Sequence, residues 1–352
     1  MSRRGLTLMV VSVLILVLGV VGSLMPVPYV ALSPGPTTNT LGPTPDKKAP
    51  LIEIQGHPVY EDGGHLNFTT VSYQGGPAQP IDLVTALRGW LSDSTSVVPE
   101  EAIFPKNQSV QKVEQENTQQ MRSSQQDAIA AALKELNVPL TTTTSIASVT
   151  KGLPADGKVK PSDKIISLDG TKTADMAAVT AIMKAHKPGD TVTLVVDRGS
   201  KQQKVEIKTA ASPEDPRRAV MGVTLQDDYT FPFTVKISVG DVGGPSAGLM
   251  FSLGIYDKLT PGSLTGGKFV AGTGTITPEG KVGPIGGIQQ KLIAARNAGA
   301  TVFFTPADNC KDAVATAPKG LRLIRADTLD GAIKSLDVLR TGQGSLPACP
   351  RS

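Results

Sequence analysis

The pattern of apolar and polar residues changes several times along the chain, and it begins with an uninterrupted apolar run. Residues 5–25, GLTLMVVSVLILVLGVVGSLM, contain no charged residue. A helix of this length can cross the apolar layer of a bilayer, so the run predicts an uncleaved transmembrane anchor. A buried core helix and a cleaved signal peptide are the alternatives, although Val20 and Gly22 form only a mediocre cleavage site.

The residues after this run are more polar. Residues 26–50 are rich in Pro, Thr and Gly and predict an extended juxtamembrane linker. Residues 51–137 predict an N-terminal α+β region, with a strand at 66–73, a short helix at 81–91 and one or two helices within 107–136. This region carries no motif to which a chemistry can be assigned.

A different pattern covers residues 138–210. Strands are expected at TSIASVT, TVTLVVDR and QKVEIKT, and the last alternates Val205 and Ile207 with polar residues, as a half-buried strand does. A helix is expected at 174–186, and ASPEDPRR at 211–218 predicts a second linker.

Residues 219–340 predict a further α+β domain, followed by a tail at 341–352. The expected strands are MGVTLQ, TVKISV, KFVAGTGTI, VFFTP and GLRLIRA, and the expected helices are SAGLMFSLGIYDKL, GGIQQKLIAARNAG, residues 309–316 and TLDGAIKSL. The fold class is therefore α+β, with an N-terminal transmembrane helix before the folded domains.

The charges of the chain bear on its topology and its partners. The net charge is +4 without a long basic block, so nucleic-acid binding has no electrostatic footprint. Arg3 and Arg4 precede the apolar run, and the next positive residue is Lys47. By the positive-inside rule, residues 1–4 are expected in the cytoplasm and the rest of the chain outside the cell.

The two cysteines, Cys310 and Cys349, both fall on the expected outer side. An even number of cysteines in an oxidising compartment predicts one disulfide, and two buried free thiols are the alternative. No Cys/His cluster has the spacing of metal ligands, so no zinc site is expected, and no motif of the chain assigns a metal or another cofactor.

One lysine stands out in the helix predicted at 286–299. On a helical wheel, Lys291 lies in the middle of a stripe of small and apolar residues, the face that normally packs inward. A desolvated lysine loses its proton more readily and can act as a base near neutral pH. The alternative is a lysine whose amine reaches solvent along the stripe.

A serine is a candidate partner for this lysine. GGPSAG places Ser246 at the start of a predicted helix, where free N–H groups and the positive end of the helix dipole suit a developing oxyanion. Taken alone, such a serine is usually only a helix cap. The histidines are His57, His65 and His186, all outside the domain at 219–340, so a Ser-His-Asp arrangement has no local support.

Three motifs in order carry a resemblance to a family. Gly-Pro-Ser-Ala-Gly at 244–248, Thr-Gly-Thr-Ile-Thr at 273–277 and Pro-Ile-Gly-Gly-Ile at 284–288 precede Lys291, and the region 215–340 resembles the proteolytic domain of Lon-type serine proteases. The resemblance implies a ribosomal protein S5 domain 2-like fold, Ser246 as nucleophile, Lys291 as general base and Thr273 as its hydrogen-bond partner. It also implies an oxyanion hole from the backbone of Gly244, Ser246 and Ala247.

Residues 138–210 resemble a PDZ domain of the bacterial protease-associated type. The resemblance rests on Gly152, Pro154-Ala155, Gly157-Lys158, Lys160-Pro161, Asp163-Lys164-Ile165-Ile166, Asp169-Gly170 and Lys187-Pro188-Gly189-Asp190. Ser162 departs from the usual glycine. The resemblance implies a groove between a strand and the helix at 174–186 that takes an extended peptide; a spacer domain is the alternative.

The whole layout is similar to membrane-anchored PDZ–Lon-like proteases of Gram-positive bacteria. It implies an ATP-independent serine endopeptidase that cleaves flexible segments of exported or membrane proteins and that can form homo-oligomers. No nucleotide is expected, because GSLTGGKF at 262–269 lacks the Ser/Thr of a phosphate loop. Gly243 stands where ATP-dependent Lon proteases usually carry an acidic residue. The other hypothesis is a PDZ adaptor or chaperone on an inactive Lon-like scaffold.

Overall fold

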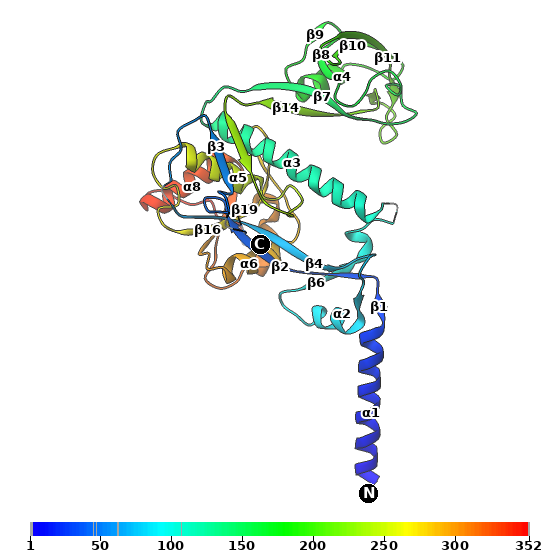
Figure 1. Ribbon diagram of the computed structural model, residues 1–352, viewed down its shortest axis with the longest axis vertical. Helices are drawn as coiled ribbons and strands as arrows, with labels where there is room; N and C mark the ends of the chain where they lie inside the picture. Colours follow the sequence, from blue (N-terminus) through cyan, green and yellow to red (C-terminus); the bar gives the residue numbers. More distant parts are fainter. Residues whose placement is uncertain (1–2, 45, 47, 62, 107, 351–352) are drawn as a thin grey trace. The chain divides into compact units, whose positions relative to one another are not determined.

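A computed structural model describes residues 3–44, 46, 48–61, 63–106 and 108–350 (Figure 1). The chain forms two compact units. One combines the residues up to Val138 with those from Phe233 onward, and the other is Pro139–Pro232. The second unit is therefore inserted into the chain of the first.

A six-stranded sheet forms the centre of the first unit. Its order is β20 (Arg322–Ala326), β19 (Val302–Pro306), β16 (Phe269–Gly272), β4 (His65–Gly75), β2 (Tyr29–Asn39) and β6 (Ser96–Pro99). Neighbours from β20 to β4 are parallel, and β2 is antiparallel to both β4 and β6. Strands from distant parts of the chain thus complete one sheet.

Helices cover both faces of this sheet. On one face α5 (Gly248–Leu259) packs on β4 through Phe251 and Phe68, whose ring centroids are 5.4 Å apart. On the other, α6 (Ile288–Asn297) shares a core with Ala271 and Phe303. Alternate residues of a strand point to opposite faces, so the two helices lie on opposite sides of the sheet.

The remaining elements of the first unit surround this frame. They are α1 (Arg3–Leu24), β1 (Pro26–Val27), β3 (Ile52–Gln55), β5 (Ile81–Asp82), α2 (Leu83–Trp90), η1 (Glu100–Ala102), α3 (Val110–Glu135), β15 (Thr234–Ile237), β17 (Thr275–Ile276), β18 (Val282–Gly283), η2 (Ala307–Asn309), α7 (Cys310–Thr316) and α8 (Leu329–Thr341). The strand β3 pairs with β15 and so joins the two parts of the chain on either side of the insertion.

The inserted unit is a small antiparallel sheet with one helix and a separate two-stranded pair. Its strands are β7 (Thr141–Val149), β8 (Lys164–Leu168), β9 (Thr171–Lys172), β10 (Thr191–Asp197), β11 (Gln202–Lys208), β12 (Ala210–Ala211), β13 (Ala219–Val220) and β14 (Val223–Thr230), and its helix is α4 (Met176–Met183). The edge strand β14 lies beside α4, where Asp227 Oδ1 accepts the Met176 N–H at 2.8 Å. Ser162 adopts φ 71°, the left-handed conformation that a glycine takes without strain.

The domain boundaries differ from those predicted by the sequence. Residues 26–50 are not a free linker, because β2 pairs along both edges inside the main sheet. The region 51–137 is not a separate region either, since β4 and α3 belong to the same unit as β16 and α5. Residues 219–232 belong to the inserted unit, where β14 pairs with β7.

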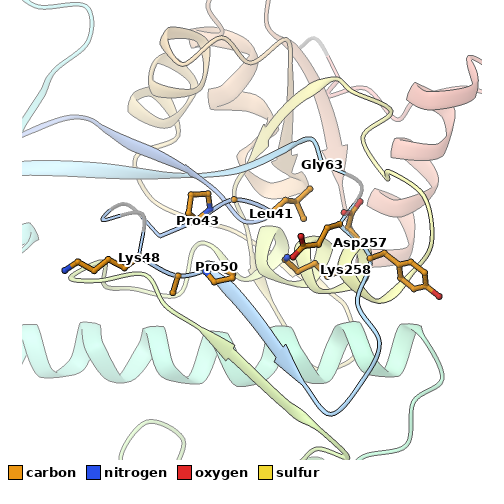
Figure 2. Close-up of a pocket in the computed structure, with 11 residues that line it drawn as sticks. Leu41, Pro43, Lys48, Pro50, Gly63, Asp257 and Lys258 are labelled. Carbon is orange, nitrogen blue, oxygen red and sulfur yellow. The ribbon is translucent and has the colours of Figure 1, made fainter.

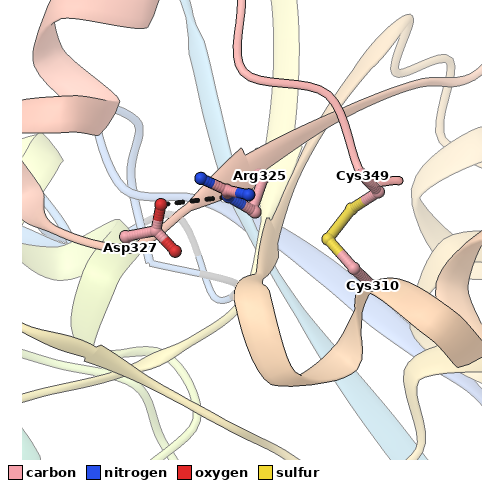
Figure 3. The surroundings of a disulfide bond; sticks show 4 residues. All are labelled: Cys310, Arg325, Asp327 and Cys349. Atoms are coloured by element: carbon pink, nitrogen blue, oxygen red, sulfur yellow. Dashed lines mark hydrogen bonds and ion pairs between the residues drawn. A yellow bond between two sulfur atoms is a disulfide. The ribbon is translucent and has the colours of Figure 1, made fainter.

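A disulfide joins Cys310, at the start of α7, to Cys349 in the tail (Figure 3). The tail also lies along β20, where the Arg325 N–H donates to the Pro347 carbonyl at 2.9 Å. The segment after α8 is therefore held against the sheet at two points.

Candidate active site

Three segments meet at the carboxyl end of β16. The loop before α5 brings Ser246 from one face of the sheet, α6 brings Lys291 from the other, and Thr273 follows the last residue of β16. Ligands of α/β sheets commonly bind at the carboxyl ends of parallel strands. The fold therefore brings these three side chains from separate elements to a sheet edge where ligands commonly bind.

The loop that carries Ser246 is fixed by its backbone. The Ser246 carbonyl accepts the Gly274 N–H at 2.8 Å, and the Leu249 N–H donates to the Gly274 carbonyl at 3.1 Å. The helix α5 begins at Gly248, so Ser246 lies just before its first turn and remains half-buried. These contacts fix Ser246 beside Gly274, the residue that follows Thr273.

The position of Lys291 follows from the start of α6. Gly287 adopts φ 67° and its carbonyl accepts the Lys291 N–H at 3.1 Å, so the helix begins one turn before the lysine. The Lys291 side chain is only 3% exposed. Among the described residues no carboxylate lies within salt-bridge range of it, and burial lowers the pKa of Lys291 from 10.5 to about 7.

Hydrogen bonds link the three residues in a ring that closes through the main-chain carbonyl of Ser246. Lys291 Nζ lies 2.7 Å from Ser246 Oγ and 3.0 Å from Thr273 Oγ1. The Thr273 hydroxyl donates to the Ser246 carbonyl at 2.9 Å, so only its lone pairs remain for the amine. A neutral Lys291 then donates to Thr273 and keeps its own lone pair for the proton of Ser246.

The three predicted oxyanion donors differ in whether their backbone N–H group already makes a hydrogen bond. The Gly244 N–H donates to the Asn117 carbonyl of α3 at 3.0 Å and is occupied. Among the described residues, no backbone hydrogen bond uses the N–H of Ser246 or Ala247. The prediction for Gly244 therefore does not hold in this conformation, because α3 accepts its proton.

The same helix accounts for the departure at Gly243. A Cβ atom at Gly243 would lie 3.0 Å from the Cβ of Asn117. An acidic side chain there would need α3 to move, so glycine suits this close approach. This contact could not be predicted, because Asn117 lies in a polar stretch that is typical of a solvent-facing helix.

Other residues that support the site were also missed. The Ser124 hydroxyl of α3 donates to the Pro245 carbonyl at 2.9 Å. Gln290, next to Lys291 and 2% exposed, donates through Nε2 to Ser96 Oγ at 2.7 Å. The position of Gln290 beside the candidate base was the one available signal in the sequence. Its partner Ser96 lies 194 residues away along the chain.

Two cavities lie at the two ends of α5. One of about 260 Å³ lies beside Pro245 and is lined by Ser124, Asp127, Thr275 and Ile276, among others. A larger one of about 500 Å³ lies at the far end of the helix, where Asp257 and Lys258 line it (Figure 2). The first cavity is lined by Pro245, the residue before Ser246, and the described residues contain no cluster with the make-up of a metal site.

Comparison with known families gives two matches. Residues 234–336 match the Lon protease (S16) C-terminal proteolytic domain, and residues 113–209 match the PDZ domain. The Lon match leaves out β2, β4 and α3, which the structure places in the same unit.

Individual proteins show the same likeness over part of their length. The Lon protease of Azospirillum brasilense is 41% identical over 137 residues, which are 37% of this chain and 16% of that protein. The Lon protease of Heliobacterium modesticaldum is 28% identical over 159 residues, 44% of this chain and 19% of that one. The chain thus spans less than a fifth of the length of these relatives.

Among solved structures, the PDZ domain of an SdrC-like protein from Listeria innocua is similar. It is 24% identical and covers 24% of this chain and 93% of that chain, with a TM-score of 0.23. We draw no argument about function from a TM-score of this size.

Proposed function

Because the chain carries a PDZ domain and a Lon proteolytic domain, we propose that it is a membrane-anchored serine endopeptidase that works without ATP. Ser246 is the nucleophile, Lys291 is the general base, and the substrates are flexible segments of exported or membrane proteins. One observation carries the proposal: a buried amine without a carboxylate partner lies 2.7 Å from a serine hydroxyl. Such an amine is a base near neutral pH.

The proposed reaction proceeds through an acyl-enzyme. Ser246 Oγ attacks the peptide carbonyl and its proton passes to Lys291 Nζ. The oxyanion accepts hydrogen bonds from the backbone N–H groups of Ser246 and Ala247. Lys291 then protonates the departing amine and removes a proton from water. The hydroxide attacks the acyl carbonyl, and Lys291 returns the proton to Ser246 Oγ as the acyl–oxygen bond breaks.

Independence from ATP is supported by the segment between α5 and β16. Residues 262–268 have the spacing of a phosphate loop, but Phe269 replaces its Ser/Thr and begins a strand instead of a helix. A phosphate loop needs a helix N-terminus behind its glycines. Without a motor to unfold folded proteins, the expected substrates are segments that are already flexible.

The proposed location of the protease is supported by α1. This helix has 22 residues, an 18-residue stretch of it has a mean hydropathy of 2.7, and it is almost entirely exposed, which suits a membrane span by length and composition. Arg3 and Arg4 at its start orient the N-terminus to the cytoplasm under the positive-inside rule. The PDZ domain is proposed to bind an extended peptide along the edge strand β14 beside α4.

The test uses the full chain in lipid nanodiscs with a fluorogenic unstructured peptide and no nucleotide. We expect cleavage by the unmodified chain and none by Ser246→Ala, with normal cleavage by Ser335→Ala, a buried serine of α8 whose hydroxyl bonds its own helix. Equal cleavage by Ser246→Ala would refute the nucleophile. No cleavage by any folded form would favour a PDZ adaptor on an inactive scaffold.

A further inference from the structure

The helix α2 presents an apolar side that is largely exposed among the described residues, although the Trp90 ring packs edge-on against Tyr29 with centroids 5.3 Å apart. Leu87, Trp90 and Leu91 are 46%, 51% and 87% exposed. They lie at i, i+3 and i+4, so they share one side of the helix. Gly89 on the opposite side and Ala86 beside the face are buried. We call the exposed side, made of Leu87, Trp90 and Leu91, the α2 face.

The α2 face is attached to the end of α1 without a flexible connection. The Leu83 N–H donates to the Met25 carbonyl at 3.0 Å, and β1 pairs with β5 directly before α2. Gly22 is the one buried residue among the described residues of α1, and a Cβ there would lie 3.4 Å from Val84 Cγ2. Figure 1 shows α2 beside the end of α1.

We propose that the α2 face lies in the outer interface of the membrane that α1 crosses. This rests on the membrane anchoring in the proposed function. The occupant is lipid because α2 is fixed to the end of α1, where Leu24 and Met25 are also exposed, at 77% and 51%. Tryptophan is favoured at the level of the headgroups, and Arg88 of the same helix can reach their phosphates.

The loop after the α2 face reaches the helix that carries the proposed base. Gln289 Nε2 of α6 donates to the Asp93 carbonyl at 2.9 Å, and Gln290 Nε2 donates to Ser96 Oγ at 2.7 Å. Gln289 precedes Lys291 by two residues, or about 3 Å along the helix axis. Seating the α2 face in the membrane therefore holds the active site close to the bilayer surface.

This placement narrows the substrate class. A serine held near the bilayer surface meets the first residues that other membrane proteins extend beyond the lipid, whereas soluble chains reach it only by diffusion. We infer that juxtamembrane segments of membrane-anchored proteins are the preferred substrates. The preference should disappear when the α2 face leaves the lipid, while cleavage of a free peptide should persist.

The only tryptophan of the chain reports on this face directly. The full chain is placed in vesicles of phosphatidylethanolamine and phosphatidylglycerol that contain phosphatidylcholine brominated at carbons 6 and 7. We expect Trp90 fluorescence to fall by about half or more relative to unbrominated vesicles, as for a ring buried about 5–10 Å into the interface. Acrylamide in the water should quench it weakly.

The variants separate the α2 face from the fold and from catalysis. Leu87→Glu with Leu91→Glu should abolish the quenching by bromine and the preference for a peptide tethered to lipid by a short spacer over the same peptide free in solution. Val59→Glu is the matched control, since Val59 is 43% exposed and lies outside α2. It should change neither, and cleavage of the free peptide should be equal in all three proteins.

Flotation of the vesicles separates the possible failures. A chain that does not float with them refutes the anchoring and the inference with it. A chain that floats while Trp90 is unquenched by bromine and open to acrylamide overturns the α2 inference alone. Trp90 shielded from both quenchers means that a protein, such as a second copy, covers the face, which also overturns it. Absent cleavage with intact bromine quenching refutes the protease proposal and leaves the α2 face in the membrane.

Discussion

At the scale of single residues, the site depends on which atom holds each proton. The Thr273 hydroxyl donates a hydrogen bond to the Ser246 carbonyl, so it must accept one from Lys291. That leaves the lone pair of a neutral amine for Ser246. In the proposed reaction Thr273 is therefore a positioning residue, which orients the amine of Lys291.

Replacing Thr273 with valine removes this acceptor while it preserves the shape of the side chain. We expect kcat/KM to fall by about 10–100-fold, less than the loss of a general base. The ammonium form of Lys291 also loses an acceptor, so the rising limb of the pH–rate profile should move to lower pH. The pH–rate profile of peptide cleavage measures both effects.

Thr305 offers a matched control for this substitution. It is fully buried in the neighbouring strand β19, and its hydroxyl has no hydrogen-bond partner among the described residues. Thr305→Val should keep the activity and the pH profile. A Thr273→Val enzyme with an unshifted profile and normal kcat/KM would contradict the positioning role.

The buried lysine should also make stability depend on pH. The pKa of Lys291 falls from 10.5 to about 7 on folding, so between these values the folded state binds fewer protons than the unfolded state. The free energy of unfolding then rises with pH in that window, by up to about 1.4 kcal/mol per pH unit.

Lys291→Met removes this term. We expect the variant to gain stability relative to the unmodified chain below pH 7, and the gain to shrink as the pH rises toward 10. Urea unfolding of both proteins at several pH values tests it. Parallel dependence of the two unfolding free energies on pH would show that Lys291 is not desolvated in the folded protein.

At the scale of elements, the angle at which α6 enters the site depends on one glycine. Gly287 has φ 67°, and a Cβ there would lie 2.6 Å from Val71 Cγ2 of β4. Gly286 beside it has open space within 4 Å. The two neighbouring glycines therefore differ in what they contribute to the placement of Lys291.

Gly287→Ala should lower the free energy of unfolding by about 2 kcal/mol, because an L-residue is strained in the left-handed region and meets β4. It should also lower kcat by displacing α6. Gly286→Ala should change stability by no more than about 0.5 kcal/mol. Equal effects of the two substitutions, measured by thermal unfolding and peptide cleavage, would refute this account of the helix start.

The elements and the boundaries differ in how far they could be predicted. The spacing of apolar residues and the positions of glycines predicted α5, α6 and most strands, because these signals are local in the sequence. The partner of a strand is not a local property. Nothing in YVALSPGPTTN indicates that β2 pairs with β4 and β6, and its Pro and Gly content favoured a linker.

The same limit of sequence-based prediction applies to the single residues of the site. Ser246, Thr273 and Lys291 stood out because they lie in motifs with a fixed order. Asn117 and Ser96 carry no motif, and their contacts with Gly244 and Gln290 arise only when distant segments meet. Long-range hydrogen bonds of this kind are visible only in the folded chain.

At the scale of the whole molecule, the PDZ unit interrupts the chain of the first unit, and strand pairing joins the two parts of that unit. The strands β3 and β15 join the two parts, and the disulfide between Cys310 and Cys349 holds the tail. The crosslink spans 39 residues of sequence. It removes conformational freedom from the unfolded chain and so favours the folded first unit.

Replacing both cysteines with serine should therefore lower the free energy of unfolding of the first unit by about 3–4 kcal/mol, from the entropy of closing a loop of this length. The inserted unit, which contains no cysteine, should unfold as before. Denaturation followed by hydrogen exchange reports on the two units separately. Two titratable thiols in protein exported to an oxidising compartment would contradict the crosslink.

The most direct test of the central claim is the rate at which a fluorophosphonate labels Ser246 as the pH is varied. For the full chain in nanodiscs we expect labelling at Ser246 alone, with a rate that rises through an apparent pKa of about 7. Lys291→Arg should remain folded and unlabelled, since arginine cannot lose its proton in a protein. Lys258→Arg, a second buried lysine at the far end of α5, should label normally. Labelling of folded Lys291→Arg at the unmodified rate would contradict the assignment of Lys291 as the base.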